Sequence, residues 1–84
     1  MIIVKYVIID GSAIVFSSAI THSEMVGYNQ KVEGAGFVRF YPSKNEWGED
    51  VVIATCYGES ISLGVVSRGE EDSFIVTQQI CGNY

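Results

Sequence analysis

The residues best suited to chemistry gather in one short stretch in the second half of the chain. The run Cys56-Tyr57-Gly58-Glu59-Ser60-Ile61-Ser62 supplies a thiol, a phenol, a carboxylate and two hydroxyls. Cys56, or a hydroxyl between Tyr57 and Ser62, could act as a nucleophile with His22 as its base. Such a pair needs contact in space, and a cysteine buried among apolar side chains is usually inert. The position of this stretch in the fold therefore decides whether it favours catalysis or binding.

The strands around this stretch are predicted to form a tight β-hairpin. Gly58-Glu59 suits a two-residue type II′ turn, because the first central position of that turn has a positive φ. One apolar face then collects three cross-strand pairs: Cys56 with Ile61, Ala54 with Leu63, and Val52 with Val65. Cys56 becomes a core residue in this register. The predicted binding residues lie at the turn and on the more polar face: Tyr57, Glu59, Ser60 and Ser62.

Trp47 is the only tryptophan and lies in the polar segment 42–48. An exposed aromatic side chain among polar residues is typical of an interface anchor. The alternative is that the ring folds back over a small core. As an exposed side chain, Trp47 joins the predicted binding residues.

Several motifs with a known mechanism are excluded by their spacing. Ser60 lacks the glycine two residues later and the strand-to-helix context of a serine nucleophile elbow. Gly34-Ala35-Gly36 has no third glycine of a dinucleotide loop. One histidine and two distant cysteines make no structural zinc site, and the acidic segment 46–50 lacks a calcium-binding loop. No metal ligand set and no cofactor are therefore predicted.

The charge distribution argues against nucleic acid as a partner. Ten acidic residues outnumber five basic ones, the net charge is −5, and the excess falls in residues 43–84. Phosphate binding needs clustered Lys and Arg, which this chain lacks. The apolar run Ile2–Ile9 is too short for a signal sequence or a membrane span. We expect a cytoplasmic protein with reduced thiols and no membrane partner.

The first half of the chain is predicted to hold three strands and a short helix. Residues 2–9 are apolar at both odd-numbered and even-numbered positions, which is typical of a strand covered on two faces. A three-residue loop 9–11 is preferred to a two-residue Asp10-Gly11 turn, since it sets Tyr6 opposite Ile14 and Val4 opposite Phe16. Thr21 and Glu24 have capping-box spacing, which leaves His22 on the surface of the helix's first turn. Phe37–Tyr41 is the third strand, and Pro42 is expected to end its pairing.

The chain is predicted to end in a helix. Ser67 and Glu70 repeat the capping-box spacing, and three acidic residues would occupy the first turn. The predicted buried stripe is Phe74, Gln78 and Cys81, with Gly82 as the C-terminal cap. The β-branched run 75–77 favours a strand instead, so both alternatives stay open for residues 73–81.

These elements predict a single small α+β domain spanning residues 1–84. Its order is ββαβββα, with a mainly antiparallel five-stranded sheet and two short helices on one face. The helices would leave apolar side chains uncovered on the other face, among them Ile3, Val7, Val15 and Ile53.

We therefore expect a small non-enzymatic interaction or ligand-binding protein that self-associates, with a protein or small molecule as a further partner. One alternative is the enzyme described above. The other is a phage or mobile-element accessory protein that sequesters a small ligand at a subunit interface.

Overall fold

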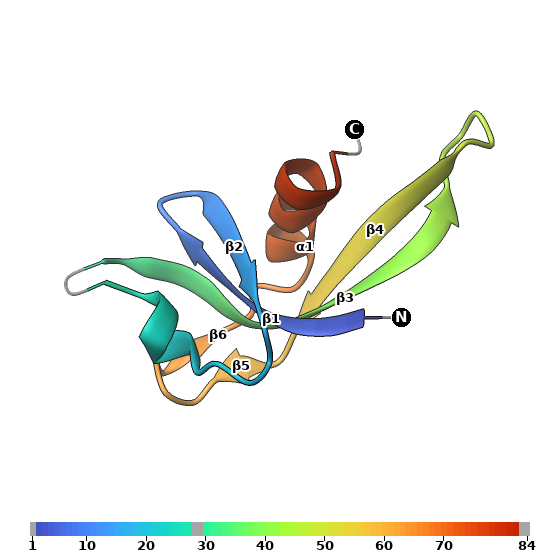
Figure 1. Cartoon of the computed structure of the whole chain (residues 1–84). Coiled ribbons are helices and arrows are strands. Elements are labelled where there is room, and N and C mark those ends of the chain that lie inside the picture. The colour runs from blue at the N-terminus through green and yellow to red at the C-terminus, as the bar shows by residue number, and fades with distance from the viewer. Residues whose placement is uncertain (1, 28–29, 83–84) are drawn as a thin grey trace.

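The computed structural model describes residues 2–27 and 30–82, and it confirms the predicted class, a small α+β domain with an antiparallel sheet (Figure 1). The sheet is curled and packs against one main helix. The elements are β1 Ile2–Ile9, β2 Ser12–Phe16, the 3-10 helix η1 His22–Met25, β3 Val32–Lys44, β4 Asp50–Tyr57, β5 Glu59–Ser60, β6 Val65–Val66, and α1 Glu70–Val76, which continues as a π-helical segment η2 Thr77–Cys81.

The sheet differs in detail from the five strands expected. Four strands pair in the order β2-β1-β3-β4, and β5 pairs only with β6 in a separate two-stranded ribbon. The prediction for residues 2–9 is confirmed, because β1 lies between two partners and is buried on both faces. Tyr6, Val7 and Ile8 are all fully buried, although neighbouring residues point to opposite sides.

The preferred register of the first hairpin was wrong. β1 and β2 join through the two-residue turn Asp10-Gly11, which sets Lys5 opposite Phe16 and Val7 opposite Ile14. Both turn residues have positive φ, 50° and 76°, as a type I′ turn requires, and this turn matches the natural twist of the strands. Because β1 is apolar on both faces, its burial pattern could not distinguish one register from the other.

The predicted hairpin centred on Gly58-Glu59 was also wrong. β4 pairs along its whole length with β3, from Phe37 opposite Tyr57 to Lys44 opposite Asp50. The chain then turns away at Gly58, whose φ is 80°. The longer strand β3 competes successfully with the local turn, because it offers eight consecutive partners where the hairpin offered fewer.

Pro42 does not end β3, contrary to the prediction. It pairs with Val52 inside the β3–β4 ladder, beyond the point where β1 stops pairing with β3 at Phe40. Backbone amides at this and every second position of the β3–β4 ladder point out of the ladder. The amides of Ala54 and Cys56 show this, because they bond to Thr77 of η2 and Ser73 of α1. The missing N–H of proline therefore leaves no ladder bond unmade.

The C-terminal segment is helical, as preferred, but it presents a different face to the core. The residue at the N-terminal cap of the helix is Gly69, not the predicted Ser67. The Oγ of Ser67 instead accepts a 3.1 Å hydrogen bond from the Gly69 amide. Phe74 is 63% exposed, whereas Asp72 and Val76 are fully buried. Gly82 closes the helix with a φ of 70°, as predicted.

The helix also satisfies backbone groups at both edges of the sheet. Ser73 Oγ accepts a 2.8 Å bond from the Cys56 amide, and Thr77 Oγ1 accepts a 3.1 Å bond from the Ala54 amide. Ser73 and Thr77 are four helical residues apart, a rise of about 6 Å, and Cys56 and Ala54 are alternate strand residues roughly 6.6 Å apart. The two spacings are similar, so both bonds can form together. At the β2 edge, the Gln79 side chain binds the Ala13 amide and the Gly11 carbonyl, each at 2.7 Å. These contacts protect edge strands that would otherwise be open to pairing.

The helix packs on one face of the sheet but leaves Val52 on that face 44% exposed beside an open pocket, and the other face is partly covered. On the helix side, Tyr6, Ile8, Val38, Ala54 and Cys56 pack with Val76. The opposite face is filled only near β2, where the segments around η1 and β6 cover one cluster: Val7, Ile9, Phe16 and Ala35.

The outer part of the β3–β4 hairpin extends away from this body (Figure 1, upper right). We call it the arm and define it as residues 41–53. It contributes to the elongated shape of the domain, 43 × 23 × 16 Å. In the described part of the chain, no helix has the length and apolar character needed to cross a membrane.

Candidate functional site

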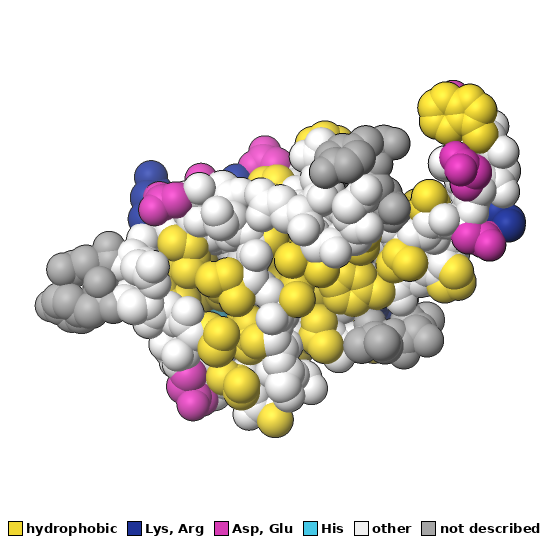
Figure 2. Space-filling view, turned by 45° about the horizontal axis from the view of Figure 1, so that its top comes forward, with side chains coloured by type: hydrophobic (Ala, Val, Ile, Leu, Met, Phe, Trp, Pro, Cys, Tyr) yellow, Lys and Arg dark blue, Asp and Glu magenta, His cyan; other side chains and the backbone are white. Residues whose placement is uncertain are grey.

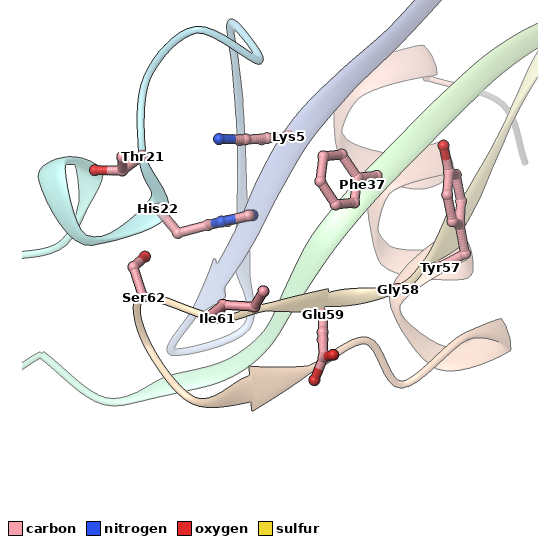
Figure 3. Close-up of a pocket in the computed structure, with 9 residues that line it drawn as sticks. All are labelled: Lys5, Thr21, His22, Phe37, Tyr57, Gly58, Glu59, Ile61 and Ser62. Carbon is pink, nitrogen blue, oxygen red and sulfur yellow. The ribbon is translucent and has the colours of Figure 1, made fainter.

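An open groove lies beside the sheet where its second face is uncovered (Figure 3). Three neighbouring strands place Lys5, Phe37 and Tyr57 in one row, because Phe37 pairs with both of the others. The remaining lining comes from the segment that starts η1 and from the loop after β4. The groove has a volume of about 610 Å³ and is lined by Lys5, Thr21, His22, Phe37, Tyr57, Gly58, Glu59, Ile61 and Ser62.

His22 forms an internal wall of this groove, not the surface position predicted for it. Its side chain is buried, and Nε2 donates a 2.8 Å hydrogen bond to the Gly36 carbonyl. The imidazole also meets Phe16 and Phe37 edge-on, with ring centroids 5.5 and 6.1 Å away. The capping box that starts η1 forms as predicted, since Glu24 Oε1 accepts a 3.1 Å bond from the Thr21 amide. η1 thereby holds the ring of His22 against the sheet.

Aromatic and cationic side chains meet at the other wall. Phe37 and Tyr57 stack with centroids 6.0 Å apart, and the Arg39 guanidinium lies 5.5 Å from the centroid of the Tyr57 ring. Lys5 Nζ donates a 2.9 Å bond to the Ile20 carbonyl at the opposite end of the row. The groove thus has an apolar floor with Lys5 in its lining, Arg39 beside it over Tyr57, and the exposed carboxylate of Glu59 at the rim.

The loop after β4 is held by its own hydrogen bonds. Ser60 is buried, its Oγ accepts a 3.2 Å bond from the Leu63 amide, and its carbonyl accepts a 2.9 Å bond from the Gly64 amide. Ser62 Oγ accepts a 3.3 Å bond from the Ser23 amide, which ties the loop to η1. Ile61 is left 89% exposed at the mouth of the groove.

The structure brings together part of the predicted site. Tyr57, Glu59 and Ser62 line the groove with His22, whereas Ser60 lies buried beside it and holds the loop. Trp47 is 73% exposed at the tip of the arm, away from the groove of its own chain and from the core.

Cys56 and His22 lie on opposite faces of the sheet. Cys56 packs with Val38 on the helix face, and His22 packs with Phe37, whose side chain points the other way. Cys56 is buried, as expected, although β3 and α1 bury it instead of the predicted hairpin. Burial raises the pKa of its thiol to about 11.

Sequence reasoning missed two strand residues of the groove, Lys5 and Phe37, and Arg39 beside it. Lys5 carried a usable signal, since it is the one charge in an otherwise apolar strand. A charge at such a position indicates an uncovered part of a sheet face. Ile61 was expected inside the hairpin, so its exposure could not have been anticipated.

In the described residues, no group of three or more His, Cys, Asp or Glu side chains is placed to hold a metal ion. No protein-family model matches the chain, and comparisons with curated proteins and with solved structures find no significant similarity.

Proposed function

We propose that this protein is a small non-enzymatic interaction protein that acts as a homo-oligomer. Its binding surface is the uncovered part of the sheet together with the groove. We call this surface the open face and define it by its side chains: Ile3, Phe37, Arg39, Tyr41, Ile53, Tyr57 and Ile61. Register supports the grouping, because Ile3 is paired with Arg39 and Tyr41 with Ile53 across neighbouring strands.

The observation that carries the proposal is the exposure of these large apolar side chains on one side of the sheet. Ile3 is 49% exposed, Tyr57 38% and Ile61 89%, whereas Val7, Phe16 and Ala35 are buried on the same face nearer β2. A contiguous apolar and aromatic surface beside charged groups is typical of a protein contact surface. Tyr57 and Arg39 are the residue types that most often dominate binding energy at such surfaces.

A test compares the oligomeric state of two charge-introducing variants. Ile61→Glu places a carboxylate on the open face, and Phe74→Glu places one on the exposed side of α1 as the matched control. We expect the wild type and Phe74→Glu to associate at micromolar concentration, and Ile61→Glu to sediment as a monomer. Equal association of all three would contradict the proposal.

The enzymatic alternative would use a hydroxyl of Tyr57 or Ser62 with His22, since all three line the groove. It is less well supported, because Nε2 of His22 already donates to Gly36 and Ser62 bonds to the η1 backbone. The groove also suits the alternative of a small ligand held between subunits. Both cysteines are unpaired, which supports a reducing compartment such as the cytoplasm.

A further inference from the structure

The arm projects beyond the end of β1. Among the described residues, its two strands pair in the sheet with each other beyond Phe40, where the pairing with β1 stops. A two-stranded hairpin alone is at best marginally stable in water. An arm of this kind therefore gains most from a surface supplied by another chain.

The tip of the arm is ordered by one side chain. Oδ1 of Asn45 accepts bonds from the amides of Trp47 at 2.9 Å and Glu49 at 3.0 Å. Backbone bonds between Asn45 and Glu49 and from Gly48 to Asn45 close the turn. The turn holds the backbone of Trp47 in place while its indole remains exposed. A backbone that is already ordered reduces the entropy lost when its side chain binds, so Trp47 is well placed to anchor a contact.

The tip of the arm is acidic and carries an aromatic side chain, and the groove has an apolar floor with cations beside it. Around Trp47, the segment Lys44–Asp50 carries three carboxylates against one ammonium. Lys5 lines the groove and Arg39 lies over the ring of Tyr57 beside it, while Glu59 in the lining and Glu24 near Lys5 carry the opposite charge. Figure 2 shows the arm standing out from the body with a hydrophobic side chain at its end and acidic side chains next to it.

The spacing of groove and tip also suits a two-fold assembly. Lys44, at the start of the tip, is seven positions after Phe37, in the groove, which corresponds to about 23 Å at roughly 3.3 Å per residue. Two antiparallel arms related by a two-fold axis would each place their tip at the other's groove. The contact is then isologous and closed, so it gives a dimer instead of a fibre.

We propose that the arm of each copy lies across the open face of a second copy and inserts Trp47 into the groove. This inference rests on the proposed function, and it names the occupant of the open face. Lys5 and Arg39 of one copy then face Glu46 and Glu49 of the other, and the apolar floor receives the indole.

Trp47 supplies its own reporter, because it is the only tryptophan. On raising the concentration through the association range, the emission maximum should shift to shorter wavelength as dimers form. Trp47→Ala should raise the dimer dissociation constant by about thirtyfold or more, as expected for a central anchor. Phe74→Ala, which removes another exposed aromatic side chain, should leave the constant within about twofold of the wild type.

A mixing experiment tests the reciprocal contact. Trp47→Ala keeps the groove, Ile61→Glu keeps the arm, and each variant alone should be mainly monomeric. An equimolar mixture should form a heterodimer with one arm seated, and the emission of the Ile61→Glu chain should shift to shorter wavelength. Circular dichroism confirms that both variants are folded.

The possible failures are distinguishable. If Ile61→Glu abolishes association while Trp47→Ala does not, the arm inference is overturned and the open face stands. If the wild type is monomeric but its groove binds the apolar fluorescent probe anilinonaphthalene sulfonate and Ile61→Glu does not, both self-association claims fail in favour of a small ligand. A wild type that associates with no change in tryptophan emission also overturns the seating of Trp47.

Discussion

The phenol of Tyr6 donates a 2.5 Å hydrogen bond to Oδ2 of Asp72, joining the central strand β1 to the helix α1 inside the core. Asp72 is completely buried, and Arg68 serves both of its oxygens, through Nε at 2.7 Å and the backbone amide at 3.0 Å. A buried carboxylate requires such partners, because an unpaired charge in the interior is costly. This network fixes which face of α1 turns inward.

The first prediction concerns the Tyr6 hydroxyl. Tyr6→Phe keeps the ring but leaves Asp72 with one donor fewer, so the free energy of unfolding should fall by about 1–3 kcal/mol. Urea unfolding measures the change. Tyr41→Phe is the matched control, since its phenol accepts an exposed hydrogen bond from Thr55, and it should change stability by less than about 0.5 kcal/mol. Equal stability of Tyr6→Phe and the wild type would contradict the role given to the network.

The second prediction concerns Gly34, which packs directly against the same carboxylate. A Cβ at Gly34 would lie 2.1 Å from Oδ2 of Asp72, so alanine cannot fit unless α1 moves. Gly34→Ala should destabilise the fold by about 1–3 kcal/mol or more in thermal or urea unfolding. Gly27→Ala meets only the flexible end of Gln30 and should have a much smaller effect. A harmless Gly34→Ala would show that Asp72 lies elsewhere.

The third prediction is a loss of stability at alkaline pH. Burial raises the pKa of the Cys56 thiol from 9.0 to about 11, and burial with the Asp72 bond raises the pKa of Tyr6 above its ordinary value. Both groups hold their proton more tightly when folded, so their contribution is complete below pH 9 and declines as the pH rises. Cys56 alone should remove about 2–3 kcal/mol of unfolding free energy between pH 9 and 11. Cys56→Ala should have a shallower decline over this range, and identical slopes would rule out the thiol as a cause.

The fourth prediction concerns the β4 edge. Thr77→Val keeps the shape of the side chain but removes the acceptor for the Ala54 amide. An unmet buried donor costs about 1–3 kcal/mol, so the fold should lose stability and the Ala54 amide should exchange faster with solvent. Thr55→Val, whose hydroxyl donates only to Tyr41, is the control. Unchanged exchange at Ala54 would mean that the helix does not protect this edge.

Two local signals in the sequence predicted local structure correctly. The capping box at Thr21 and the terminal Gly82 both form as expected, because each depends on backbone groups a few residues away. The burial of β1 on both faces was predicted correctly, because apolar residues stand at both its odd-numbered and its even-numbered positions.

Features that depend on distant partners were not predictable from these signals. Gly58-Glu59 suits a hairpin turn, but β4 has a longer partner in β3. Asp72 resembles a helix-start acid on the surface, and only the approach of Tyr6 and Arg68 allows it to be buried. His22 lies inside because η1 folds over Gly36. Among the groove residues, Tyr57, Glu59 and Ser62 had been predicted as binding residues, whereas Lys5 and Phe37 were missed because their place beside Tyr57 depends on the β1–β3 and β3–β4 registers.

The mass of the wild-type protein in solution tests the central claim most directly. Sedimentation equilibrium over a micromolar concentration series should show a species of twice the chain mass that dissociates on dilution. The open face would then be buried between two copies. A single species of monomer mass at every concentration would contradict the account.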